Sequence, residues 1–254
     1  MVQNLNTEPS DPLKNLDIIA NAFKWVVETR RAVRVFSPDS VPERVILGAL
    51  SAAHSAPSAS NLQPWDFYWI RSEPAKAEAR RLCLKQPASE SAHEIIVCVA
   101  NFGVWKERRN FFIDYYRKAG IQLPKPFDVY YEKIVPLMYA IGPFGILGLI
   151  KRLVFALTRT FQPMSAVPCS RSELLASATK NAAFACQNFM LSVRSSGYDT
   201  CPLDGFDPWR MKRLLGLSQH QKPILVIAVG KRSEGDSVYG PKVRCDIKKV
   251  IHII

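Results

Sequence analysis

The sequence lacks the short motifs by which most nucleotide-binding, metal-binding and hydrolytic proteins are recognised. It contains no G-x-G-x-x-G segment after an expected strand and no G-x-x-x-x-G-K-[ST] loop. Its six cysteines form no C-x-x-C pair, and its four histidines lie nowhere near them at metal-ligand spacing. No Ser/His/Asp or Cys/His signature of a protein nucleophile is present. We therefore expect no metal site, reduced cysteines, and side chains and loop amides as the ligands of any phosphate.

Long uninterrupted apolar segments are also absent. The N-terminus, MVQNLNTEPSDPLKNLD, lacks the apolar core of a signal peptide, which predicts a cytoplasmic protein with a loose lead-in at residues 1–14. Residues 134–150 carry no charge, but the run is at the short limit of roughly 17 to 25 residues for a membrane span, and prolines and glycines interrupt it. Segment 134–161 is therefore expected to be a broken apolar hairpin. It could serve as a lid or dimer surface, as a peripheral membrane contact, or, against its breaks, as a span.

The composition is that of a globular protein with an excess of positive charge. The 254 residues are 48% hydrophobic, enough to bury a core in one large domain or two small ones. The formal net charge is +12 and the sequence pI about 9.5. Phosphate-bearing ligands, anionic membranes and nucleic acids all suit that charge. Against nucleic acid, the basic residues form no long helical stripe and accompany no zinc or RNA-recognition motif.

Apolar periodicity predicts a mixture of helices and strands. Residues from Asn15 onward have apolar positions at helical spacing and predict a first helix. Two S-x-x-E capping boxes predict helices that begin at Ser40, with Pro42 in the first turn, and at Ser170. The runs WDFYWI, EIIVCVA and PILVIAVG predict strands, the latter two covered on both faces, and DIKKVIHII predicts a last strand. This irregular alternation indicates an α+β fold.

Residues 102–167 fit that scheme poorly and are expected to form an inserted lid or hairpin region. The insertion begins with the charged and aromatic run WKERRNFFIDYYRK and ends in the apolar segment described above. Its aromatic side chains are candidates for the walls of a substrate pocket, although core packing is the alternative for each of them. The candidates are Trp105, Phe111, Phe112, Tyr115 and Tyr116.

Three arginines alternate with apolar residues in the stretch RRAVRVFS, residues 30–37. A guanidinium group offers a fork of donors that matches phosphate bidentately, so Arg30, Arg31 and Arg34 are candidates for an anion cradle. The alternative is that they extend from a surface strand into solvent.

A second basic pair lies far away in sequence. Lys242 and Arg244 of GPKVRC would lie on one side of an extended segment. Between the two basic motifs, Gly205 of PLDGFD can bring a backbone amide close to a flat ligand, because glycine has no Cβ.

The order of these motifs resembles that of the FMN-dependent nitroreductase family. RRAVRVF resembles the family's opening arginine motif, and APSASNLQPWDF its Pro-Ser-x-x-Asn-x-Gln-Pro-Trp loop. GYDTCPLDGFD resembles the segment facing the flavin, and GPKVRC the closing phosphate clamp. The resemblance implies a single domain over residues 15–254, with a central, mainly antiparallel sheet flanked by helices, in an intertwined homodimer. The last strand could exchange with the partner's sheet.

Carried over by position, the resemblance implies a set of FMN-binding residues. Arg30, Lys242 and Arg244 would grip the phosphate, and Arg34 would place a cation near the pyrimidine edge of the ring. Loop 57–61 would come from the partner subunit, as would Asp204 and Gly205, with the Gly205 amide directed at N5. The implied positions are Arg30, Arg31, Ala32, Arg34, Pro57, Ser58, Ala59, Asn61, Lys85, Gln86, Asp204, Gly205, Lys242 and Arg244.

Several of these positions are less well defined or depart from the family pattern. Lys85 and Gln86 are alternatives for one further ring contact, and Arg31 has no specific role. Ala32 stands where many relatives have serine, and Asp204 where some have a longer glutamate.

The implied activity is that of an FMN oxidoreductase that takes hydride from NAD(P)H onto flavin N5 and reduces a small-molecule acceptor such as a nitroaromatic or a quinone. No catalytic side chain is required, because the cofactor carries the redox chemistry. The alternatives are another flavin-dependent activity on the same fold, such as a dehydrogenase or dehalogenase, and a basic protein that binds nucleic acid or anionic membranes.

Overall fold

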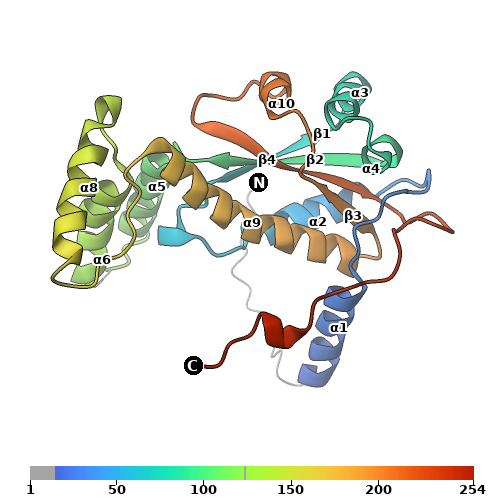
Figure 1. The fold of residues 1–254 in the computed structure, drawn as a ribbon, viewed down its shortest axis with the longest axis horizontal. Helices are drawn as coiled ribbons and strands as arrows, with labels where there is room; N and C mark the ends of the chain where they lie inside the picture. Colours follow the sequence, from blue (N-terminus) through green and yellow to red (C-terminus); the bar gives the residue numbers. More distant parts are fainter. Residues whose placement is uncertain (1–14, 123) are drawn as a thin grey trace.

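A computed structural model describes residues 15–122 and 124–254, and its centre is a four-stranded sheet (Figure 1). The strands are β1 (Trp65–Ile70), β2 (Glu94–Asn101), β3 (Asp199–Leu203) and β4 (Gln221–Gly230), in the spatial order β1-β2-β4-β3. Every neighbouring pair is antiparallel. The prediction of an α+β fold around an antiparallel sheet is confirmed, and the intertwined dimer stays a prediction.

The three strands predicted from apolar runs are present, and β3 is an addition to them. β2 is buried over its first seven residues, because helices cover both faces of the sheet. The sequence analysis did not identify β3, since Pro202 and the Gly and Asp residues around DTCPL are typical of a turn. Proline is tolerated there because β3 lies at one end of the strand order.

Helices cover both faces of the sheet (Figure 1). On one face, α2 (Glu43–His54) and α9 (Arg171–Ser195) pack against each other and against side chains such as Ile96 and Cys98. On the other face, α3 (Glu73–Leu82), α4 (Pro87–Ser91) and α10 (Pro208–Leu214) enclose side chains such as Ile95 and Val97. Side chains of β2 point alternately to the two faces of the sheet and thus contribute to two separate cores. Helix α1 (Leu16–Thr29) packs against α9.

The long helix α9 begins where its capping box was predicted. The Oγ of Ser170 accepts a hydrogen bond from the amide of Glu173 at 3.2 Å. The carboxylate of Glu173 accepts from the amide of Cys169 at 2.7 Å, and this bond holds the pKa of Glu173 below its usual value. The helix ends at Ser195, and Gly197 then adopts a left-handed conformation with φ of 85°.

The predicted start of α2 is wrong. The helix begins at Glu43, its N-cap is Pro42, and no side chain caps it, so Ser40 lies two residues outside the capping position. The amide of Val41 bonds to Nδ1 of His93 at 3.3 Å, and the Val41 side chain is buried. These contacts hold the segment extended through Pro42, whose ψ is 138°.

The predicted strand at the C-terminus, DIKKVIHII, is also wrong for this chain. Residues Ile247–Lys249 form a single 3₁₀ turn, η5, and the tail after Val250 has no regular structure. The carboxylate of Asp246 accepts from the amide of Lys248 at 3.0 Å and caps this turn. The outer side of β3, where a further strand could pair, already bridges to Ala32. Pairing of the tail with a partner subunit stays a prediction.

The predicted insertion is helical and lies at one end of the molecule, away from α1 (Figure 1). Its elements are α5 (Trp105–Lys118), α6 (Lys125–Val129), the π-helix η3 (Tyr130–Ile134), α7 (Val135–Tyr139), η4 (Pro143–Gly145) and α8 (Ile146–Arg159). The expected break lies at Gly142 and Pro143, where the helices on either side are bent by 77°. In the described part of the chain, no single helix is long and apolar enough to cross a membrane.

Candidate functional site

The arginine stretch lies alongside β3, at the edge of the sheet. The amide of Val33 donates to the carbonyl of Thr200 at 3.1 Å, and Ala32 forms a bridge with the same residue. Val33 and Phe36 are buried in the core, whereas Arg30, Arg31 and Arg34 are half-buried. Val33 and Phe36 therefore anchor the stretch in the core, while the three arginines stay partly accessible to solvent.

The second basic motif, residues 240–245, lies against the arginine stretch. The Nζ of Lys242 donates to the carbonyls of Val27 and Glu28 at 3.2 and 2.9 Å, at the C-terminal end of α1 where the helix dipole is negative. Arg31 donates to the carbonyl of Gly240 at 2.7 Å. The two motifs and the residues between them line one cavity of about 320 Å³, formed by Arg30, Arg31, Ala32, Arg34, Tyr239, Pro241, Lys242, Val243 and Arg244.

The electrostatics of this basic cavity favour an anion. None of its five cationic side chains forms an ion pair with an acidic side chain in residues 15–122 and 124–254. Burial lowers the pKa of Arg30, and the neighbouring guanidinium of Arg244 lowers it further. A phosphate dianion would relieve this crowding of like charges and would accept hydrogen bonds from several guanidinium forks.

Arginines just outside the cavity are neutralised instead. Arg194 and Arg232 both contact Asp199, at 3.3 and 2.8 Å, and this carboxylate is 3% exposed. In β3, next to Thr200, Cys201 is fully buried. Burial raises the pKa of its thiol, so it is not a reactive thiol. The cavity therefore concentrates positive charge that no acidic side chain of the described residues neutralises.

Tyr239 is a site residue that sequence reasoning did not identify. The guanidinium of Arg34 lies 5.4 Å from the centre of its ring, and the amide of Arg34 donates to Ser237 at 2.7 Å. The sequence offered one signal for Tyr239, which is its position directly before GPKVRC. The hydrogen bond to Ser237 holds the backbone of Arg34, and the contact with Tyr239 holds its guanidinium group.

The Gly205 loop follows β3 directly and contacts Gln86. The Nε2 of Gln86 donates to the carbonyl of Gly205 at 2.6 Å, across 119 residues of sequence. A Cβ at position 205 would lie 3.4 Å from the same nitrogen, at the limit of ordinary van der Waals contact, so this contact alone does not require glycine. Of the two predicted alternatives, the structure brings Gln86 to the loop and leaves the Lys85 side chain exposed. Asp204 and Gly205 are themselves exposed.

The loop at residues 57–63 is tightly held in an unusual conformation. Its 3₁₀ turn, η2 (Ala59–Asn61), is fixed by a bond from the amide of Ala59 to Oδ1 of Asn181 at 2.8 Å. The Oγ of Ser58 accepts from the amide of Gln63 at 2.9 Å. Ser60, Asn61 and Gln63 have positive φ, and strained backbone of this kind is frequent in ligand-binding loops. We call residues 57–63 the strained loop.

This loop lies at the opposite end of the sheet from the basic cavity. It leads into Trp65, which pairs with Ala100 and through it with Lys222 of β4, whereas Thr200 beside the arginines pairs with Val229. The two positions on β4 are seven residues apart, about 23 Å along the strand. Within one chain, Pro57, Ser58, Ala59 and Asn61 are therefore not brought to the basic cavity.

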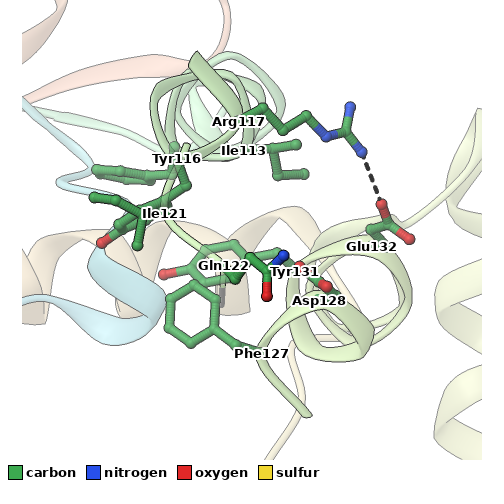
Figure 2. Close-up of a pocket in the computed structure, with 10 residues that line it drawn as sticks. Ile113, Tyr116, Arg117, Ile121, Gln122, Phe127, Asp128, Tyr131 and Glu132 are labelled. Atoms are coloured by element: carbon green, nitrogen blue, oxygen red, sulfur yellow. Dashed lines mark hydrogen bonds and ion pairs between the residues drawn. The ribbon is translucent and has the colours of Figure 1, made fainter. Parts of the chain in front are cut away.

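The insertion contributes a second cavity, of about 360 Å³, which lies between α5 and the π-helix (Figure 2). Phe112, Tyr116, Phe127 and Tyr131 supply aromatic walls, and an ion pair of 3.0 Å joins Arg117 to Glu132 beside them. Of the five aromatic residues predicted for a substrate pocket, only Phe112 and Tyr116 line this cavity. Trp105 stacks on Tyr139, whereas Phe111 and Tyr115 are exposed.

The π-helix η3 connects the cavity of the insertion to the strained loop at residues 57–63. The hydroxyl of Tyr131 donates to the carbonyl of Ser60 at 3.0 Å, and the hydroxyls of Tyr130 and Ser60 lie 2.7 Å apart. Tyr131 and Val135 are buried against Leu62. Sequence reasoning did not find this contact, because a π-helix has no sequence signature; π-bulges are frequent at functional sites.

Known proteins share both the sequence pattern and the fold. YdgI of Bacillus subtilis, provisionally named an NAD(P)H nitroreductase, is 26% identical over 219 residues, which cover 85% of this chain and 91% of that protein. The 4-nitrobenzoate reductase of Pseudomonas putida is 24% identical over 225 residues, covering 87% and 90% of the two chains. A crystal structure from Exiguobacterium sibiricum, in complex with FMN, matches with a TM-score of 0.67 at 23% identity, over 91% of this chain and 97% of the other.

The sequence model of the nitroreductase family matches residues 27–121 and 154–231 and leaves out 122–153, inside the predicted insertion. The matched segments contain the arginine stretch, the strained loop and the Gly205 loop. With more than half of its length matched, this chain belongs to the nitroreductase family.

Proposed function

We propose that this protein is an FMN-dependent oxidoreductase that takes hydride from NAD(P)H and delivers it to an electron-poor acceptor such as a nitroaromatic or a quinone. The observation that carries the proposal is the basic cavity, in which two motifs more than 200 residues apart gather five cations without an acidic partner in the described chain. The FMN complex of the E. sibiricum relative and the names of YdgI and the P. putida reductase support it.

The residues of the cavity suit the phosphate and the ring edge of FMN. Arg30, Lys242 and Arg244 would hold the phosphate, and Arg34, fixed by Ser237 and Tyr239, would supply the cation at the pyrimidine edge. Bound FMN supplies a ring nitrogen that accepts hydride from NAD(P)H and returns it to the acceptor. The guanidinium of Arg34 would stabilise the negative charge that develops on the ring edge.

We place Gly205 in the same subunit as the arginines, unlike the sequence-based expectation. The arginine stretch and the Gly205 loop are both connected to β3, one beside Thr200 and the other directly after Leu203. The bond from Gln86 holds the peptide that follows Gly205 and would so help to keep the loop in place, with the Gly205 amide facing the ring.

The strained loop is proposed to act across a homodimer. Because Ser58 and Asn61 lie at the far end of the sheet from the basic cavity of their own chain, they suit the flavin of a second subunit. Exposed Pro57, Ala59 and Asn61 would be covered in that assembly. Each flavin would then be enclosed by residues from both chains.

The insertion is proposed to select the acceptor, and the Tyr116→Ala variant tests this. Removing one aromatic wall of the cavity in the insertion should change KM for bulky quinones by about 10-fold. Single apolar contacts in a pocket discriminate between substrates by about this factor. FMN content should not change. Tyr115→Ala is the matched control, since its side chain is 50% exposed and lies outside the cavity. Equal effects of the two variants would contradict a role of the cavity in acceptor choice.

The proposed function is tested by following the two half-reactions separately. The FMN-loaded protein is mixed anaerobically with NADH or NADPH, and loss of the flavin absorbance is recorded. The reduced protein is then mixed with nitroaromatics and quinones, and we expect at least one acceptor class to restore the oxidised spectrum. Reduction without reoxidation by either class would favour a different flavin-dependent activity. A protein that takes up no FMN would favour the anion-binding alternatives.

A further inference from the structure

Helix α8 lies on the outside of the insertion (Figure 1). It exposes a continuous apolar stripe that no described part of the chain covers. Its members recur at intervals of three and four residues and therefore share one helix face. The exposed fractions are Ile146 59%, Leu149 61%, Ile150 52%, Leu153 60%, Val154 51% and Leu157 69%, and the flanking Phe144 and Phe161 are 101% and 89% exposed.

The opposite face of α8 is fixed against the rest of the insertion. Lys151 is 4% exposed, and its Nζ donates to the carbonyls of Leu137, Met138 and Pro168 at 2.9 to 3.1 Å. Three acceptors match the three donors of an ammonium group. Gly148 lies so close to Cys169 that a Cβ there would be 2.0 Å from its carbonyl oxygen. Helix α8 therefore cannot turn its stripe inward.

The charge around the stripe is mainly positive. From residue 133 to residue 171 the chain contains five basic residues and no Asp or Glu. The basic residues are Lys133, Lys151, Arg152, Arg159 and Arg171. Lys151 is buried and Arg152 pairs with Glu173, so the cations without an acidic partner in the described residues are Lys133, Arg159 and Arg171. An apolar face with this excess of positive charge is complementary to a surface with an apolar interior and anionic head groups.

The length of α8 sets how it could meet such a surface. Its 14 residues span about 21 Å, which is shorter than the roughly 30 Å hydrocarbon core of a bilayer. A short amphipathic helix of this kind lies in the plane of the membrane interface.

A second copy of this chain suits other apolar surfaces better. Exposed apolar side chains also occur on α1, α9 and the C-terminal tail, for example Phe23, Phe184 and Ile251. Helix α1 lies on the other side of the molecule from α8, whereas α9 begins beside the insertion, where Glu173 pairs with Arg152 (Figure 1). Helix α1 and the tail also carry acidic residues beside their apolar side chains, since Asp17 and Glu28 lie on α1 and Asp246 precedes the tail turn.

We propose that α8, together with Phe144 and Phe161, docks this protein peripherally on an anionic lipid bilayer, with the helix axis parallel to the surface. Docking of this kind would bring a lipid-soluble acceptor to the insertion. The inference depends on α8 alone and holds for any activity of the basic cavity.

The proposal is tested by flotation of the full-length, FMN-loaded protein with lipid vesicles. Vesicles of phosphatidylcholine containing phosphatidylglycerol should bind the protein at least 10-fold more strongly than vesicles of phosphatidylcholine alone, and added salt should weaken binding. The double variant Leu153→Glu/Leu157→Glu should lose at least 10-fold of this affinity, because both side chains are exposed apolar members of the stripe. Arg159→Glu should mainly reduce the preference for anionic lipid.

Trp209→Glu is the matched control, because Trp209 is an exposed apolar residue, 77% exposed, on α10 outside the stripe. It should bind vesicles as the original protein does. FMN content and sedimentation coefficient are measured for every variant and should be unchanged. Equal binding to neutral and anionic vesicles, or unchanged binding of the double variant, would overturn the proposal. A double variant with fewer subunits would show instead that a second copy covers the stripe, and resistance to extraction by salt and alkali would show insertion across the bilayer.

Discussion

Replacing Arg34 with alanine is expected to slow the reduction of bound FMN by NAD(P)H by about 100-fold, which is the usual effect of removing one preorganised group that faces developing charge. The guanidinium of Arg34 is half-buried and lies over the ring of Tyr239, while its backbone is bonded to Ser237. The cation is therefore already in place before hydride arrives. Stopped-flow absorbance of the flavin, with saturating nicotinamide, measures the effect.

The flavin itself should stay bound in this variant, because Arg30, Lys242 and Arg244 remain to hold the phosphate. Arg34→Lys is the control that keeps the charge but loses the planar fork, and it should recover part of the rate. If Arg34→Ala released FMN and the remaining holoprotein were reduced at the original rate, Arg34 would be a phosphate ligand and its assignment to the ring edge would be wrong.

Replacing Arg30 with alanine is expected to have the complementary effect and to weaken FMN binding by about 10- to 100-fold. A hydrogen bond to a charged group contributes about 1.5 to 3 kcal/mol, and each 1.4 kcal/mol is tenfold in affinity. Arg30 is half-buried, and its pKa is lowered by burial and by the neighbouring Arg244. Quenching of flavin fluorescence on titration with the flavin-free protein measures the affinity.

The control for Arg30→Ala is Arg81→Ala, which removes an equal charge from the surface of α3, where Arg81 pairs with Glu78 at 2.6 Å. This variant should bind FMN as the original protein does. A similar loss of affinity in both variants would mean that net charge, and not a specific contact of Arg30, determines binding.

Local sequence patterns were sufficient for most of the fold. Apolar runs identified β2 and β4, which helices cover, and the aromatic run WDFYWI identified β1 at the edge of the sheet. The Ser170 cap is a contact between neighbours in sequence. The errors arose where a distant contact decided the local conformation. His93 holds the segment before α2 extended, and the edge of β3 is already bridged by Ala32.

The same distinction applies to the candidate site. The sequence identified the basic residues, but it could not show that Lys242 docks on the end of α1 or that Arg34 faces Tyr239. It also could not choose between Lys85 and Gln86, because the contact of Gln86 with Gly205 joins segments 119 residues apart. The implied roles of these residues in FMN binding remain predictions.

The central claim, that the basic cavity is an FMN phosphate site, is tested most directly by comparing FMN with riboflavin, which has the same ring and lacks the phosphate. Calorimetric titration of the flavin-free protein should give one FMN per subunit, bound at least 100-fold more tightly than riboflavin, since several charge-assisted contacts are lost with the phosphate. The difference should shrink in Arg30→Ala. Equal affinities for the two flavins, or no binding of either, would contradict the assignment of Arg30, Lys242 and Arg244 to the phosphate.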